Sequence, residues 1–397
     1  MNAKRRWILV VVVGLVASSA YSEPPKGGKA VEPDMARLNL RIVEQGKSEP
    51  IPARVKIRDR EGFLYRPKDA PAYRMSFVCR GETSLDLPSG RYSLEISRGP
   101  EYALAEKGFS LNKDQTVTVE LDRWIHMAQL GWWSGEFHIH RPLDQVDDMI
   151  LAEDLNVGVV QTIWNDRDLW DGGAPPGPAV RMADETHVSD ILSTEDERGA
   201  GAVLLLNLKE PLRLPPYGNW YPTNIDLCRR AKEMGGWVDI EKPFWWGSPV
   251  VAALGLADSV GITNNHLTEI SVWDYPAWGR GRDSYYADGP RGFWEYVCGI
   301  WYHLLNCGYR LPASAGSASG VLPNPVGFNR CYVHLNGPFS YTQWLEGLKA
   351  GRSFVTNGPM MFVKVAEKEP GETVELPVGE AVDVSVEIRC TEPVSDV

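Results

Sequence analysis

The stretch Gly131–Pro142, GWWSGEFHIHRP, decides how the rest of the chain is interpreted. Phe137 and Ile139 alternate with His138 and His140, which is the period-two pattern of a β-strand. Residues two apart lie on the same face of a strand, so the two imidazoles can reach one cation or two adjacent ones. A bare His-x-His also arises by chance on a wetted strand face, so the surrounding sequence has to decide between the two interpretations.

Length, composition and charge exclude several classes of protein. A chain of 397 residues is expected to hold two or three domains. Its 43% hydrophobic and 23% charged residues are typical of a soluble globular protein. The net charge of −11 argues against a nucleic-acid partner, because phosphate binding needs a basic surface. The six cysteines include no Cys-x-x-Cys pair, which excludes a zinc ribbon and gives no clear disulfide framework.

The N-terminal residues have the pattern of a signal peptide. Basic residues at positions 4–6 precede the apolar run Trp7–Ala17, and small residues at 18–20 offer a cleavage site. The apolar run is shorter than the roughly 20 residues that span a bilayer. We therefore expect a signal peptide at 1–22, a leader at 23–37, and an exported protein, periplasmic or extracellular, without a membrane span in its mature form.

Residues 38–125 carry the signals of a small all-β domain. Leu38–Val43, Arg91–Ile96 and Thr116–Leu121 alternate apolar and polar residues, with turn residues between such runs. The segment resembles carboxypeptidase-regulatory-like or transthyretin-like β-sandwiches, which implies an accessory role. Alternation returns at 363–397, where we expect a terminal β segment.

Residues 126–362 alternate apolar runs with helical segments, which predicts an α/β domain with parallel strands. Expected strands are Val157–Thr162, Ala202–Asn207, Gly236–Ile240, Ser259–Thr263, Glu269–Trp273 and Arg330–Leu335. Expected helices are Leu143–Leu155, Ile225–Met234, Arg291–Asn306 and Tyr341–Ala350, the last of them capped by Ser340. A barrel of this kind places its chemistry at the carboxyl ends of the strands, where His138, His140, Asp239, Glu241 and His266 stand.

The opening motif, the downstream LPASAGSASG and the segment WLEGLKAGRSFVTNGPM together resemble the PHP (polymerase and histidinol phosphatase) superfamily. The branch that they resemble is the CehA/McbA-like metallohydrolases. The resemblance implies a distorted seven-stranded β/α barrel, of (β/α)7 type, with a site for two or three metal ions. The sequence departs from the family pattern at 163–166, at 241–243 and at 316–320, where a histidine or aspartate of the usual motifs is missing.

The remaining acidic and imidazole groups suggest a reduced site for one divalent metal ion, zinc, iron or manganese. We expect it to be held by four side chains and to keep an open water position. The expected metal ligands are His138, His140, Glu241 and His266. Asp239 or Glu195 is expected to accept a proton, and Lys242, Trp245, Trp246 and Trp164 are expected to bind the substrate. Two alternatives stay open: residues 195–198 are a solvated charged turn, and Lys242 tethers Glu241 instead of a substrate.

Two functions from different classes fit these residues, with a phosphatase ranked third. The first is an exported metal-dependent hydrolase that activates a water molecule on a small ester, amide or carbamate substrate. The second is a non-catalytic exported binding protein on a degenerate barrel, with a glycan or another partner as ligand.

Overall fold

The computed structural model describes residues 34–199, 201–213, 218–277 and 279–393. The predicted signal peptide and residues 23–33 of the predicted leader lie outside these residues. Within the described ranges, no helix is both long and apolar enough to cross a bilayer.

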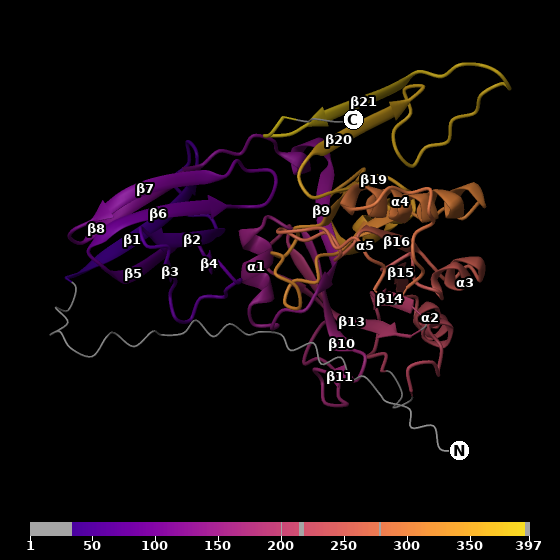
Figure 1. The fold of residues 1–397 in the computed structure, drawn as a ribbon, viewed down its shortest axis with the longest axis horizontal. Helices are drawn as coiled ribbons and strands as arrows, with labels where there is room; N and C mark the ends of the chain where they lie inside the picture. Colours follow the sequence, from indigo (N-terminus) through magenta and orange to yellow (C-terminus); the bar gives the residue numbers. More distant parts are fainter. Residues whose placement is uncertain (1–33, 200, 214–217, 278, 394–397) are drawn as a thin grey trace. The chain divides into compact units, whose positions relative to one another are not determined.

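The first domain is built from two β-sheets (Figure 1). In the three-stranded sheet, β1 lies between β5 and β8, antiparallel to the first and parallel to the second. In the other sheet the order is β3-β2-β6-β7, and β4 also pairs with β2. The inward residues of both sheets, such as Leu40 and Ile96, are buried and form one core. The strands are β1 (Met35–Glu44), β2 (Ala53–Asp59), β3 (Leu64–Tyr65), β4 (Phe77–Cys79), β5 (Glu82–Pro88), β6 (Gly90–Ser97), β7 (Ala105–Leu111) and β8 (Gln115–Leu121).

The second domain is organised by one large sheet whose main path has the order β17-β16-β15-β14-β13-β10-β9-β18-β19. Two short strands extend it, β11 beside β10 and β12 beside β13. The 3-10 turn η1 (Met127–Leu130) leads into it. The strands are β9 (Trp132–Ile139), β10 (Val157–Trp164), β11 (Arg167–Asp168), β12 (Val180–Met182), β13 (Val188–Arg198), β14 (Gly201–Leu206), β15 (Trp237–Ile240), β16 (Ser259–Thr263), β17 (Ala313–Ala315), β18 (Arg330–His334) and β19 (Ser353–Thr356).

The large sheet mixes parallel and antiparallel neighbours. β9, β10 and β13 are parallel, as are β15, β16 and β17, but β14 is antiparallel to both of its neighbours and β18 is antiparallel to β9. The sheet closes on itself, because β17 contacts β9, β18 and β19. Five α-helices occur in the described residues: α1 (Val146–Ala152), α2 (Asn224–Glu233), α3 (Ser248–Ala253), α4 (Pro290–Asn306) and α5 (Tyr341–Lys349).

The predicted α/β barrel of (β/α)7 type is therefore wrong. The chain between β10 and β13 forms β11 and β12 in place of a crossover helix, and β13 returns directly as β14. The predicted strand Glu269–Trp273 is not a strand either. Strands buried on both faces read as continuous apolar runs whichever way their neighbours point, so the sequence pattern did not distinguish a mixed sheet from a parallel one.

The strand that carries the two histidines is fixed by close packing. A Cβ on Gly135 of β9 would lie 2.4 Å from the indole of Trp344, so only glycine lets α5 approach this strand. Trp344 is fully buried, and its indole N–H donates to the carbonyl of Trp133. The predicted cap at Ser340 is present, because its hydroxyl accepts a hydrogen bond from the backbone N–H of Gln343.

The chain ends in a separate two-stranded sheet. β20 (Met360–Val365) pairs antiparallel with β21 (Val384–Arg389), and most of the residues of this ribbon are exposed or half-buried. It lies where the sequence predicts a terminal β segment.

Candidate metal centre

Two strands of the large sheet bring two histidines and one glutamate together. His138 lies near the end of β9 and His140 follows that strand, while Glu195 comes from β13. The His138 Nε2 atom lies 2.9 Å from His140 Nε2 and 3.2 Å from Glu195 Oε2. The third side of the triangle, from His140 Nε2 to Glu195 Oε2, measures 3.0 Å. His138 and Glu195 are buried, and His140 is partly exposed.

The dimensions of this triangle fit one metal ion. Zinc-like ions bind nitrogen and oxygen at about 2.0–2.2 Å, so two ligand atoms on one ion lie about 3.0–3.4 Å apart at ordinary coordination angles. The three measured separations lie in or next to this range. Two imidazoles and one carboxylate on one face are a known ligand set for zinc and iron, and they leave the opposite face open for water or substrate.

Three further charged residues, Glu197, Glu241 and Lys242, lie next to the triangle. Glu241 follows β15, and its Oε1 atom lies 3.1 Å from Nδ1 of His138. Its other oxygen contacts the ammonium of Lys242, which also lies 2.8 Å from Oε1 of Glu197. Glu195, Glu197 and Glu241 form a second group whose carboxylate oxygens all lie within 4.8 Å of one another. A carboxylate on the far nitrogen of a ligating histidine fixes the tautomer and the ring orientation.

The protonation states follow from burial and from the neighbouring charges. Burial opposes a charge on His138, but Glu195 and Glu241 outweigh it and raise the pKa of His138 to about 10. Burial also opposes the charge on Glu195, yet His138 and His140 hold its pKa well below the ordinary value. In Glu197 burial dominates, and the pKa of this carboxyl is raised. Without a metal ion, a proton on His138 therefore partly balances the carboxylates.

A glycine-containing loop supports the two histidines from behind. A Cβ on Gly316 would lie 2.5 Å from the Cβ of His138, and one on Gly320 would lie 2.3 Å from the carbonyl oxygen of His140. The backbone N–H of His140 also donates to the carbonyl of Ser319. The segment in which the sequence lacks the expected aspartate and histidine therefore holds the two histidines in place by its backbone.

The structure does not bring His266 or Asp239 into either group. The ring of His266 packs against Phe244 and Phe293, with Nδ1 3.2 Å from the carbonyl oxygen of Trp273. Burial lowers the pKa of His266 to about 4. The carboxylate of Asp239 accepts hydrogen bonds from two serine hydroxyls, those of Ser259 and Ser314, and burial raises its pKa to about 6.

The predicted substrate-binding residues lie in different environments. Trp164 packs its ring 4.7 Å from that of His140, at the edge of the centre. Trp245 is buried with its ring centroid 5.5 Å from Nζ of Lys242. Trp246 is 61% exposed. The ammonium of Lys242 pairs with Glu241, as the alternative interpretation of this lysine expects.

Glu197 is the member of the cluster that the sequence interpretation missed. Glu195 is only 1% exposed, which excludes a solvated charged turn at this residue. Both glutamates lie on β13, two residues apart and on one face. The same period-two rule that selected the histidines would have selected this pair, had the segment been recognised as a strand.

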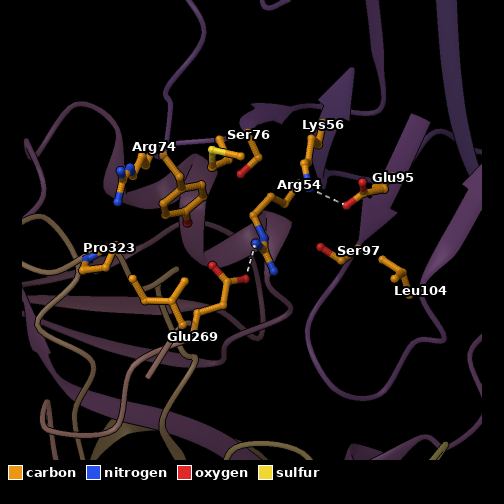
Figure 2. A pocket seen from close by; sticks show the side chains of 12 residues that line it. Arg54, Lys56, Arg74, Ser76, Glu95, Ser97, Leu104, Glu269 and Pro323 are labelled. Carbon is orange, nitrogen blue, oxygen red and sulfur yellow. Dashed lines mark hydrogen bonds and ion pairs between the residues drawn. The ribbon is translucent and has the colours of Figure 1, made fainter. Parts of the chain in front are cut away.

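A cleft of about 520 Å³ lies apart from the metal centre, and none of the residues of the centre lines it (Figure 2). Its charged side chains are largely paired. Arg54 contacts Glu153 at 2.8 Å and Glu269 at 3.0 Å, and Lys56 contacts Glu95 at 2.7 Å. Figure 2 shows the last two of these pairs as dashed lines.

Comparison with known proteins does not assign the chain to a family. No family model matches it, and no curated protein does. Among solved structures, PsfC from Pseudomonas syringae is 14% identical with a TM-score of 0.37, over 57% of this chain and 91% of that one. The minor pilin GBS52 of Streptococcus agalactiae is 19% identical with a TM-score of 0.20, over 24% of this chain and 47% of that one. The major pilin BcpA of Bacillus cereus is 14% identical with a TM-score of 0.19, over 23% and 31%.

The chain spans less than half of each of these pilins, and likenesses at such TM-scores carry no argument about fold or function. The assignment to the PHP superfamily and its CehA/McbA-like branch is wrong. The strand-rich mixed sheet is not the barrel that the resemblance implied, and no family model supports it.

Proposed function

We propose that this chain is an exported metal-dependent hydrolase whose single metal ion is held by His138, His140 and Glu195. The observation that carries the proposal is the triangle of their ligand atoms, with sides of 2.9, 3.0 and 3.2 Å. A metal ion held by His138, His140 and Glu195 would act as a Lewis acid, activating water as a nucleophile and polarising a substrate oxygen. The expected metal is zinc, iron or manganese.

The other charged groups have distinct roles in this proposal. Glu241 orients His138 through the contact with Nδ1. Glu197 accepts the proton of the attacking water, because its side chain is 19% exposed and its oxygen lies within 4.8 Å of Glu195. The 2.8 Å contact with Lys242 partly offsets the rise in the pKa of Glu197 that burial causes. Asp239, which accepts hydrogen bonds from two serine hydroxyls, lies outside both groups and has no role in this proposal.

The charge of the centre bears on the substrate class. Three carboxylates face one ammonium, and that ammonium is already paired with two of them. An anionic phosphoester would add negative charge to this cluster, whereas a neutral ester, amide or carbamate would not. Trp164, beside His140, is placed to contact the apolar part of such a small-molecule substrate.

Metal analysis combined with hydrolysis assays tests the proposal. Purified protein should contain about one zinc, iron or manganese ion per chain and should hydrolyse members of a panel of esters, amides and carbamates. A chelator should abolish the activity, and the metal should restore it. A folded protein that stays free of metal under metal excess would refute the proposal and favour the non-catalytic binding protein. Export is tested separately, since the N-terminus of secreted protein should begin after the predicted signal peptide, residues 1–22.

A further inference from the structure

We infer that Lys242 is a built-in cation that occupies the second carboxylate group of the centre, so that the centre binds one metal ion where its carboxylates would otherwise hold two. The inference rests on the proposed metal centre and specifies how many ions it takes. Lys242 is thereby a positioning residue, which acts through Glu197 and Glu241 without contact with the reacting atoms.

The second group has the composition of a metal site of its own. Glu195, Glu197 and Glu241 each offer a carboxylate oxygen, and these oxygens lie within 4.8 Å of one another. Glu195 belongs both to this group and to the triangle with the histidines. A carboxylate shared in this way is suited to bridge two ions, which in two-metal sites lie about 3.5–4 Å apart.

The ammonium of Lys242 already contacts two of the three carboxylates of this group. Its Nζ atom lies 2.8 Å from Oε1 of Glu197 and is in direct contact with Oε2 of Glu241. The residue is 2% exposed, so water does not replace these partners. A divalent ion at the same oxygens would meet a buried positive charge at contact distance, which is strongly unfavourable in a site of low dielectric constant.

The backbone and a neighbouring ring also fix the position of the Lys242 ammonium. It directly follows Glu241 in the chain, so the backbone anchors the ammonium next to one of its carboxylates. The ring of Trp245 lies 5.5 Å from Nζ and favours a cation at that place. Glu197, bonded to an ammonium and not to a metal ion, keeps a carboxylate lone pair for proton transfer.

Manganese titration tests this inference on the full-length protein. With excess Mn²⁺, the wild-type chain should bind one ion per chain and give the electron paramagnetic resonance spectrum of isolated Mn²⁺. Lys242→Met removes the charge and shortens the side chain by only one atom, so this variant should bind two ions and give a spin-coupled spectrum. Lys209→Met, at an exposed lysine, is the matched control and should behave as wild type.

Each outcome decides between the hypotheses. Two coupled ions in the wild-type chain would overturn the inference, and this measurement needs no variant to fold. A folded Lys242→Met protein that still binds one ion would overturn it as well. No ion in the wild type would refute the metal centre itself, which is a different result from two. Lys242→Arg, which retains a cation, should keep the ratio at one.

Discussion

The metal centre and the cleft of Figure 2 both gather charged side chains, but they balance them differently. In the cleft, Arg54 lies between two glutamates and Lys56 pairs with a third, so each of these cations has its own partner. In the centre, the carboxylates of Glu195, Glu197 and Glu241 face one permanent cation. Each of these three glutamates at the cleft contacts an arginine or a lysine, whereas Glu195 of the centre contacts two histidines.

This difference explains why the metal centre is the better candidate for chemistry. Buried carboxylates without enough cations are costly unless a proton or a metal ion compensates them. A proton on His138 is one such compensation: burial opposes it, but the neighbouring glutamates outweigh burial and raise the pKa of His138 to about 10. A divalent ion at the same nitrogen would compensate more charge. Perturbed groups of this kind cluster at functional sites.

The largest effect is expected from removing an imidazole ligand. His138→Ala or His140→Ala should bring metal content and hydrolysis below detection, because two remaining ligands do not hold a zinc-like ion. His303→Ala, at an exposed histidine of α4, should change neither. Elemental analysis and the hydrolysis panel provide the readout. Full metal content in a folded His138→Ala protein would show that the ion binds at a site other than the proposed centre.

The next largest effect is expected at Glu197, the residue that only the structure revealed. Glu197→Gln should lower kcat by about 10²–10⁴-fold while metal content stays at one ion per chain, because the proton acceptor is lost and the ligands remain. Steady-state kinetics with elemental analysis checks both parts. An unchanged kcat would mean that another group accepts the proton.

Glu241→Gln is expected to have a smaller effect, since this residue contacts the far nitrogen of His138. Loss of such an orienting carboxylate usually costs about 10–100-fold in metal affinity or activity. Competition with a fluorescent chelator measures the affinity. Affinity as low as in His138→Ala would make Glu241 a direct ligand, as the sequence interpretation proposed.

The metal-free protein should lose stability as the pH rises from about 6.5 towards 10. Burial disfavours the charged form of His138, but its glutamate partners dominate and raise the pKa to about 10 from the ordinary 6.5. The folded state therefore binds the proton more tightly, and its stabilisation is complete below the ordinary value and lost as the pH passes the raised one. The slope should be at most about 1.4 kcal/mol per pH unit. Denaturant unfolding at several pH values measures it, and His138→Gln should abolish it.

The smallest effect is expected in the cleft. Glu269→Gln removes one partner of Arg54, which keeps the buried Glu153. Because Glu269 is partly exposed, the free energy of unfolding should fall by only about 0.2–1 kcal/mol, and metal content should not change. Thermal unfolding and elemental analysis provide the test. Loss of the metal in this variant would link the two regions that the comparison separates.

Local sequence was sufficient for several parts of this protein. The period-two pattern of 137–140 placed His138 and His140 on one face of a strand, and the structure has β9 there with both rings converging. Ser340 marked the start of α5 through its hydroxyl. These features depend on residues a few positions apart, for which backbone geometry alone determines which side chains meet.

The sheet topology and the membership of the centre were decided by tertiary structure. Glu195 is 57 residues and Glu241 is 103 residues from His138 in the chain, and only the closing of a mixed sheet brings them together. The same closing leaves His266 among aromatic rings and brings in Glu197. A pattern of apolar runs records which residues are buried, but it does not record which strand lies beside which. That depends on long-range packing, and with it the identity of the groups that share a metal ion.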